Sequence, residues 1–336
     1  MIITKTPFRM SFFGGGTDME EYFKEYGGAV ISTTFDKYCY VIARHLPRFF
    51  DYSSELVYSK IERVSELSDI EHPLIRNAMK MLDMYEVRLS YEADLPARSG
   101  LGTSSSFAVG MLNAFHVLKK EITSKELLAK EAIYLERVLC NEAGGWQDQI
   151  AAAYGGLNRI DFNSQGFHVS PIIMSQNRKD NLQNNLMMFF TGFTRLSSEI
   201  QNANQVASGD KNKQLKEMYE LVDVAEKILT DEKQSLGDFG KLLDYTWKLK
   251  KQTGTKVSTS DIDRLYEKGI KAGALGGKLL GAGGGGFLVF YVEPEYQQSV
   301  KDALAELMYI PFGFENEGTQ LLHYTPESYE PKEKVK

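Results

Sequence analysis

The first half of the chain alternates between segments with strand-like and helix-like spacing of apolar residues. Residues 2–13 predict a strand that runs into a glycine turn, and residues 19–26 predict a short helix closed by a glycine pair. The segments at 29–34 and 37–44 are rich in Val, Ile, Tyr and Cys, so they predict two paired strands.

The pattern continues into the second half of the chain. Thr123 and Glu126 form a capping-box pattern that opens a helix over 127–141. A strand is predicted at 186–190, and we place a domain boundary loosely around 170–185. The remaining predicted elements are a helix at 73–85, a strand at 87–92, a helix at 107–115, a polar helical stretch at 201–234, helices at 239–252 and 262–272, a strand at 287–292 and a helix at 296–307. This mixture predicts an α+β fold.

The composition is that of an ordinary globular chain of 336 residues, 43% hydrophobic and 25% charged, long enough for two domains. A formal net charge of −6 argues against nucleic acid as the main partner. No apolar run reaches the roughly 20 residues that span a bilayer, and the N-terminus reads as a strand rather than a signal peptide. Cys39 and Cys140 lie in apolar surroundings and predict free buried thiols. We therefore expect a cytoplasmic protein with no membrane partner.

The segment from Leu95 to Ser106 carries the strongest chemical signal, because two glycines and three serines precede an apolar helical run. Gly100 and Gly102 let the backbone approach a ligand closely. A glycine turn that feeds a helix N-terminus directs free N–H groups and the positive end of the helix dipole to one place, which suits phosphate. The alternative is a tight turn with Ser/Thr capping. It is not a Walker A loop, because no Gly-Lys-Ser/Thr sequence ends a glycine loop in this chain.

Two further segments complete a pattern of three. The chain begins with Arg9-x4-Gly-x3-Asp18, continues with Pro96-x3-Gly-Leu-Gly-x-Ser-Ser105, and ends with Gly281-Ala-Gly-x-Gly-Gly286. In this order the three segments resemble the signature motifs of the GHMP kinases, the superfamily of galactokinase, homoserine kinase, mevalonate kinase and phosphomevalonate kinase. The resemblance implies ATP and Mg²⁺ as cofactors.

The resemblance also implies a division into domains and a branch of the family. It implies an N-terminal nucleotide-binding domain at 1–178, a ferredoxin-like C-terminal domain at 179–336, and a late glycine loop that packs against the phosphate loop. Gly14-Gly-Gly-Thr-Asp18 departs from the Gly-Glu-His-x-Asp of galactokinases. Together with Gly144-Gly-Trp-Gln-Asp148 it looks like the branch of D-glycero-D-manno-heptose 7-phosphate kinases and fucokinases. Because fucokinases are much longer chains, the length favours the heptose phosphate kinases.

The resemblance implies which residues hold ATP and the metal ion. Ser104, or its neighbour Ser105, would offer a hydroxyl to Mg²⁺. Glu136 lies beside an apolar helical stripe, where a carboxylate needs a partner, and it precedes Asp148 by the family spacing of twelve. The alternative for Glu136 is a surface ion pair with a neighbouring basic residue, Arg137 or Lys130. The backbone N–H groups that would cradle the ATP phosphates belong to Ser99, Gly100, Leu101, Gly102, Thr103, Ser104 and Ser105.

The resemblance implies that Asp148 is the general base, which takes the proton from the attacking sugar hydroxyl. Its alternative role is a helix N-cap after the glycine pair. Arg9 stands where the family places an arginine beside that aspartate, so the resemblance implies that it holds Asp148 ionised and stabilises the transferring charge. The alternative for Arg9 is a surface ion pair.

The resemblance implies that Asp18 binds the sugar, and its carboxylate can accept two sugar hydroxyls at once. Gly15, Gly16 and Thr17 would line the same pocket, and the alternative for Asp18 is to cap the helix that follows. A substrate phosphate would need a basic clamp. Arg195 is one candidate for it. The other is a cluster of three basic residues at a strand end, Arg44, His45 and Arg48, for which ordinary solvated side chains are the favoured alternative.

We thus expect an ATP-dependent sugar kinase that phosphorylates the anomeric hydroxyl of D-glycero-D-manno-heptose 7-phosphate to the 1,7-bisphosphate. Two alternatives remain: a 1-kinase for L-fucose or a uronic acid, and a non-catalytic sugar sensor on a kinase fold. The sensor is disfavoured because the predicted catalytic and metal-binding residues are all present. The sequence is compatible with a homodimer.

Overall fold

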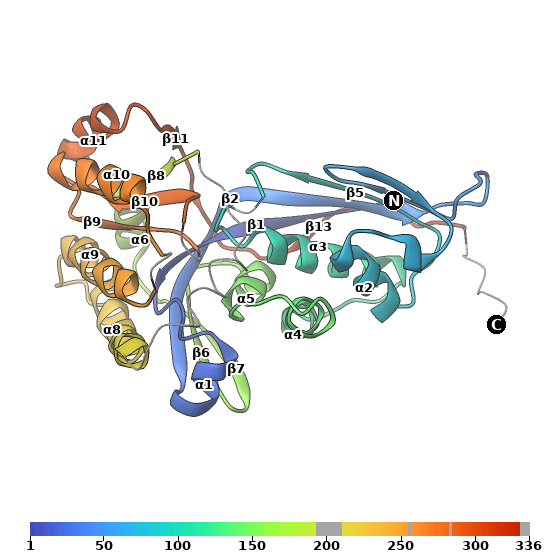
Figure 1. Ribbon diagram of the computed structural model, residues 1–336, viewed down its shortest axis with the longest axis horizontal. Helices are drawn as coiled ribbons and strands as arrows, with labels where there is room; N and C mark the ends of the chain where they lie inside the picture. Colours follow the sequence, from blue (N-terminus) through green and yellow to red (C-terminus); the bar gives the residue numbers. More distant parts are fainter. Residues whose placement is uncertain (98, 193–209, 255–256, 282–283, 330–336) are drawn as a thin grey trace.

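Two β-sheets with helices packed against them make up the molecule (Figure 1). The computed structural model describes residues 1–97, 99–192, 210–254, 257–281 and 284–329. Within these residues a nine-stranded sheet is formed mainly by the first half of the chain, and a four-stranded sheet by the second half. The predicted α+β class is confirmed.

The larger sheet is built around one long strand. Its strands are β1 (Ile2–Phe13), β2 (Gly28–His45), β3 (Ser54–Val57), β4 (Ile61–Val64), β5 (Val87–Ala93), β6 (Asn158–Asn163), β7 (Gly166–Pro171), β12 (Phe314–Glu315) and β13 (Gln320–Tyr324). The predicted strand at 2–13 is confirmed. The prediction of two paired strands within 29–44 is wrong, because both halves belong to β2 and pair with β1. Asp36, which lies between the two predicted strands, exchanges hydrogen bonds of 2.8 and 2.9 Å with the backbone of Gly313, so its polar groups are satisfied within the sheet.

Helices α2 to α5 cover one face of this sheet (Figure 1). Ser124, and not Thr123, caps α4, since its hydroxyl accepts the Leu127 N–H at 3.1 Å; the predicted cap was one residue early. The predicted single helix over 127–141 is an α-helix that continues as the π-helical segment η2. The helical elements of this part are α1 (Glu20–Tyr26), η1 (Leu67–Asp69), α2 (Pro73–Met81), α3 (Thr103–Leu118), α4 (Lys125–Ile133), η2 (Tyr134–Leu139) and α5 (Gln147–Tyr154).

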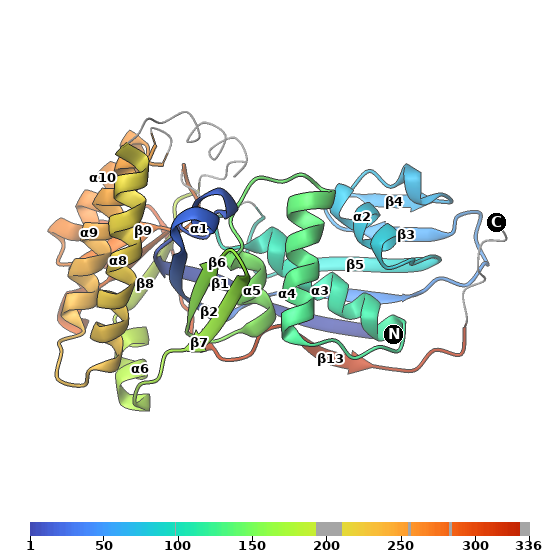
Figure 2. The same ribbon diagram turned by 90° about the horizontal axis from the view of Figure 1, so that it is seen from below.

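The four-stranded sheet has the strand order β11-β8-β10-β9, and each neighbouring pair is antiparallel. With helices between β8 and β9 and between β10 and β11, this is the predicted ferredoxin-like arrangement. Figure 2 shows its helices α8 to α10 beside the larger sheet. Its elements are α6 (Gln176–Asn184), β8 (Leu186–Phe190), α8 (Asp210–Thr230), α9 (Gly237–Gln252), α10 (Ser260–Lys271), β9 (Gly276–Leu279), β10 (Phe287–Tyr291), η3 (Pro294–Tyr296), α11 (Gln297–Ala303) and β11 (Met308–Ile310).

The two sheets share a hydrophobic core at the end of β1. The Phe239 ring on α9 meets the rings of Phe12 and Phe13 edge-on, with centroids 5.3 and 5.1 Å apart. After β11 the chain returns to the larger sheet, where β13 pairs with β1. The division at 178/179 stays a prediction; it falls inside α6, and the last strands of the predicted second domain belong to the first sheet.

The structure also bears on two expectations from composition. Both cysteines are free; Cys39 is buried, while Cys140 is only partly buried. In the part of the chain that the structure describes, no helix combines the length and apolar character needed to cross a bilayer.

Candidate functional site

The central glycine loop has the backbone geometry of an anion site. Gly100 and Gly102 adopt left-handed conformations with φ of +81° and +72°. The α3 helix follows directly, and Ser106 N–H makes an early helical bond, to Gly102 O at 2.9 Å. In the described part of the chain, the N–H groups of Thr103, Ser104 and Ser105 have no backbone partner, so they can bind a ligand. The Ser99 hydroxyl is buried and has no hydrogen-bond partner among the described residues, which also suits a ligand at this loop.

The late glycine loop packs directly on this loop, as the resemblance implied. A Cβ on Gly100 would stand 2.3 Å from Leu280 O, and a Cβ on Gly281 would stand 2.4 Å from Gly100 Cα. On Gly286 it would stand 2.1 Å from Ser99 O. Because no side chain fits at these positions, the glycines allow the two loops to touch and fix the phosphate loop against the second sheet.

Arg9 and Asp148 form a bidentate ion pair beside the phosphate loop. Arg9 Nε and Nη2 donate to the two Asp148 carboxylate oxygens at 2.7 and 2.8 Å, and Arg9 Nη1 donates to Gly100 O at 2.7 Å. The Arg9 side chain is 5% exposed and that of Asp148 is 24% exposed. The surface-pair alternative for Arg9 therefore does not hold. The arginine orients the carboxylate, while one side of Asp148 remains open to a substrate.

Glu136 is buried in the π-helical segment η2, a kind of segment that often marks functional sites. It is 1% exposed and accepts hydrogen bonds from the Ser105 hydroxyl, at 2.7 Å, and from Gln149 Nε2. The surface-pair alternative is thus excluded; Lys130 bonds to Glu126 instead. Of the two serines left open by the sequence, Ser105 contacts Glu136 and Ser104 is exposed. No group of three or more His, Cys, Asp or Glu side chains that could hold a metal occurs among the described residues.

Asp18 joins the first glycine loop to the start of α5. Its carboxylate accepts the Gly16 N–H at 2.8 Å and the Gln147 N–H at 3.4 Å, and it is 3% exposed. Asp18 does not cap α1, which has no side-chain cap. The Thr17 hydroxyl is fully used inside the loop, since it bonds to Gly14 O and Ala29 O.

Two lysines that the sequence reading missed point into the same region. Lys250 on α9 donates to Gly15 O at 2.8 Å, and Lys278 on β9 donates to Phe12 O at 2.9 Å. Burial lowers the pKa of Lys250, with Asp18 opposing the shift. Burial, reinforced by the positive charges of Lys250 and Arg9, lowers the pKa of Lys278 to about 7. Part of each side chain still reaches solvent.

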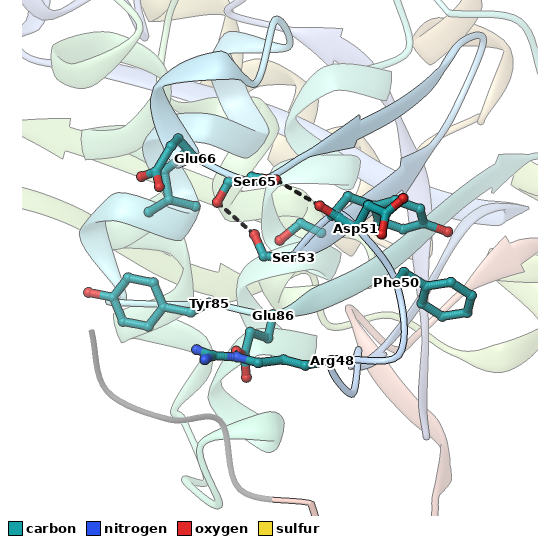
Figure 3. Close-up of a pocket in the computed structure, with 11 residues that line it drawn as sticks. Arg48, Phe50, Asp51, Ser53, Ser65, Glu66, Tyr85 and Glu86 are labelled. Atoms are coloured by element: carbon teal, nitrogen blue, oxygen red, sulfur yellow. Dashed lines mark hydrogen bonds and ion pairs between the residues drawn. The ribbon is translucent and has the colours of Figure 1, made fainter. Parts of the chain in front are cut away.

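The basic cluster at 44–48 lies away from this site. Thr34 is the strand partner of Arg9, and Arg44 follows it by ten residues on β2, which is about 33 Å along an extended strand. Arg48 pairs instead with the buried Glu86, beside a cavity of about 290 Å³ (Figure 3). Arg195, the other predicted clamp, lies outside the described residues. The cavity is lined by Arg48, Phe50, Asp51, Tyr52, Ser53, Ser54, Ser65, Glu66, Leu67, Tyr85 and Glu86.

Comparison with known proteins identifies the family. The GHMP kinases N terminal domain matches residues 73–156, and the GHMP kinases C terminal domain matches residues 210–310. A D-glycero-alpha-D-manno-heptose 7-phosphate kinase from Campylobacter jejuni is 32% identical over 339 residues, which cover 95% of this chain and 98% of the relative. The chain belongs to the GHMP kinase family. It is a sugar kinase, and GHMP kinases use ATP.

This kinase is also similar to a plant fucokinase in sequence and to a bacterial heptose phosphate kinase in structure. The bifunctional fucokinase/GDP-fucose pyrophosphorylase of Arabidopsis thaliana is 29% identical over 64% of this chain, which corresponds to 21% of that relative. A crystal structure of a D-glycero-D-manno-heptose 1-phosphate kinase from Bacteriodes thetaiotaomicron superposes with a TM-score of 0.76 over 97% of this chain and 100% of that one. At 24% identity, this match shows the shared fold.

Proposed function

We propose that this kinase transfers the γ-phosphoryl group of ATP to the anomeric hydroxyl of D-glycero-D-manno-heptose 7-phosphate, giving the 1,7-bisphosphate and ADP. The observation that carries the reaction type is the ion pair of Arg9 and Asp148 at the edge of the phosphate loop. The heptose phosphate kinase of C. jejuni, which aligns along nearly the whole chain, supports the choice of sugar.

The reaction needs an oriented nucleophile and stabilised charge. In our proposal the Asp148 carboxylate accepts the proton of the anomeric hydroxyl as that oxygen attacks the γ-phosphorus and ADP leaves. Arg9 keeps the carboxylate aimed at the hydroxyl through two hydrogen bonds. Its third bond, to Gly100 O, ties the base to the phosphate loop, so the two reactants are positioned by one connected unit.

The phosphate loop and Glu136 would hold the nucleotide and its metal. The N–H groups at the start of α3 suit the ATP phosphates, as predicted for residues 99–105. Glu136 fits a cation, because the buried carboxylate has only neutral partners, Ser105 and Gln149, among the described residues. Magnesium, when bound, neutralises charge on the phosphate oxygens. Of the predicted hydroxyls, we favour Ser105 over Ser104 as the one that joins Glu136 in holding it.

The acceptor sugar is proposed to bind against the first glycine loop. Gly15 and Gly16 are partly exposed, and Asp18 lies directly behind them. Sugar binding by Asp18 stays a prediction. Because its carboxylate is nearly buried, direct contact with a sugar would require the glycine loop to move. Otherwise Asp18 contributes by fixing the position of Gly16. Thr17 is a support of the loop, because its hydroxyl is already bonded on both sides.

ATP consumption with Mg²⁺ across a panel of sugars and sugar phosphates, with phosphorus NMR of the product, tests this proposal. Selective turnover of the heptose 7-phosphate to an anomeric phosphate is the expected result. Asp148→Asn should lower kcat by about 10²- to 10⁴-fold with ATP binding within about threefold. Asp180→Asn, at an exposed position of α6, is the matched control and should leave kcat unchanged. Full activity of Asp148→Asn contradicts the assignment of the base.

A second candidate is a 1-kinase for L-fucose or a uronic acid, which the similarity to the fucokinase part of the Arabidopsis relative supports. Turnover of fucose but not of the heptose phosphate in the same panel would favour it. The cytoplasmic location and the homodimer stay predictions from the sequence.

A further inference from the structure

Lys250 and Lys278, which belong to the second sheet and its helices, both contact the first glycine segment, residues 12–16. Their ammonium groups donate to two carbonyls of this segment, Gly15 O at 2.8 Å and Phe12 O at 2.9 Å. Lys250 Nζ also lies 3.0 Å from the position that a Cβ on Gly16 would take. Two cations from separate elements, α9 and β9, thus converge on one short stretch of chain.

Among the described residues, these two lysines are not part of any ion pair. Their neighbours on α9 have carboxylate partners, since Lys248 pairs with Asp244 and Lys251 with Asp263. In the described parts of the chain, neither Lys250 nor Lys278 has a carboxylate within 4.0 Å, and each donates to a carbonyl instead. A carbonyl holds an ammonium in place without neutralising it. Burial lowers the pKa of both groups, and the nearby Asp18 carboxylate opposes the shift only in part.

Unpartnered polar atoms line the same place. Ser11 Oγ and Gln147 Oε1 are buried and have no hydrogen-bond partner among the described residues. The Ser11 hydroxyl and the Gln147 amide nitrogen stand 3.7 and 3.8 Å from the position of a Cβ on Gly15, so a methyl-sized group would fit beside that glycine. Buried polar groups without partners are rare in native proteins and point to a ligand that completes them.

The carbonyls that hold the two lysines follow Arg9 along the chain, on the side away from the phosphate loop. Arg9 N–H bonds to Leu101 O, so Arg9 marks the side of the phosphate loop. Phe12, which anchors Lys278, follows Arg9 by three residues, or about 10 Å of strand. A phosphorylated sugar with its anomeric hydroxyl at Asp148 would have to span about this interval. We propose that Lys250 and Lys278 form the binding site for the phosphate group of the acceptor sugar, an inference that rests on the proposed function.

Equilibrium binding without ATP tests the lysine pair separately from turnover. The probes are D-glycero-D-manno-heptose 7-phosphate and mannose 6-phosphate, each compared with its unphosphorylated sugar by calorimetry. Lys250→Met and Lys278→Met are expected to weaken binding of the sugar phosphates about 10- to 100-fold and to change binding of the free sugars less than threefold. Lys248→Met, on the same helix as Lys250 but paired with Asp244, is the control and should leave binding unchanged.

The pH dependence gives a second readout that a merely structural lysine would not produce. Lys278 faces Lys250, Arg9 and Asp18, and it loses its proton as the pH rises above about 7. Affinity for the sugar phosphate should therefore fall above that pH in the wild type, and should fall less in Lys278→Arg, which stays charged.

Three results would overturn the proposal. One is equal weakening of phosphorylated and free sugars by the lysine variants, which would make the lysines structural. Another is unchanged sugar phosphate binding with impaired turnover, which would assign them to the transferring phosphoryl group. The third is failure of the wild type to prefer either sugar phosphate over its free sugar. If the wild type binds the sugar phosphates through the lysines but does not phosphorylate them, the proposed function fails and the phosphate site stands.

Discussion

Replacing Arg9 by lysine tests whether the geometry of the ion pair, and not its charge alone, supports catalysis. Arg9 makes three side-chain hydrogen bonds of 2.7–2.8 Å, two to Asp148 and one to Gly100 O. A lysine keeps the charge but has a single nitrogen, so it cannot reproduce the bidentate pair. We expect it to lose two of the three bonds.

The size of the effect follows from these contacts. A hydrogen bond to a charged group contributes about 1.5–3 kcal/mol, so two lost bonds correspond to about 3–6 kcal/mol. At 1.36 kcal/mol per factor of ten, Arg9→Lys should lower kcat by about 10²-fold at the lower end and about 10⁴-fold at the upper end. The loss should appear in kcat, because the pair orients the base in the transition state, while KM for ATP changes by less than about threefold.

The assay is ADP release at saturating substrates, with thermal unfolding measured in parallel to keep each variant well below its Tm. Arg44→Lys is the matched control, because Arg44 is an exposed arginine that bonds only to the carbonyl of the adjacent residue among the described contacts. The double variant with Asp148→Asn should be little worse than Asp148→Asn alone, since Arg9 acts through that carboxylate. A kcat for Arg9→Lys within threefold of the wild type would refute this reasoning.

Further predictions concern the metal site, the glycine contact and pH. Ser105→Ala should raise the Mg²⁺ concentration for half-maximal turnover about tenfold and Ser104→Ala less than threefold, as a magnesium titration of activity would show. Gly281 has a φ of +86° and packs against the phosphate loop, so Gly281→Ala should lower the free energy of unfolding by about 1–3 kcal/mol and raise KM for ATP. Urea unfolding measures the first effect. The hydrogen bond with Glu131 raises the pKa of His116 above its ordinary 6.5, partly offset by burial. The stability advantage of the wild type over His116→Gln should therefore be full below about pH 6.5 and disappear as the pH rises through the folded-state pKa; urea unfolding between pH 5.5 and 8.5 measures it.

The sequence pattern predicted elements correctly where the signal is local, and it failed where an element depends on pairing with a distant segment. The strand at 2–13 was correctly placed because apolar residues end in three glycines, a signal that needs no distant partner. The strand was predicted to break between residues 34 and 37, yet it continues through Asp36 because the segment at Gly313 satisfies its polar groups. The short β3 and β4 were not predicted, since four residues each hold a strand only through pairing with a neighbour.

Among the site residues, too, those with a local sequence signal were predicted and one that depends on long-range packing was missed. Arg9, Asp148 and Glu136 were predicted as site residues because they stand at the spacings of the family motifs, and the structure places Arg9 against Asp148 and Glu136 against Ser105. Lys250 was missed because lysines on an amphipathic helix are normally solvated, and only packing against Gly15 reveals its role. Lys278 did carry a signal, a lysine in a glycine-rich strand before the late glycine loop, but it was compared only with the Walker A pattern.

The cations of this site have two kinds of partner, a carboxylate for Arg9 and backbone carbonyls for Lys250 and Lys278, and this difference indicates their roles. Arg9 is neutralised by Asp148 and fixed by three bonds, so it is suited to hold a base in one orientation. Lys250 and Lys278 are anchored by carbonyls and by the shared core that Phe12 forms with Phe239, so packing sets their positions and their charge stays available. A buried cation without an ion-pair partner raises the free energy of the unliganded protein, so binding of an anion beside it is especially favourable. This energetic contrast favours binding of a phosphorylated acceptor over a neutral sugar by the same enzyme.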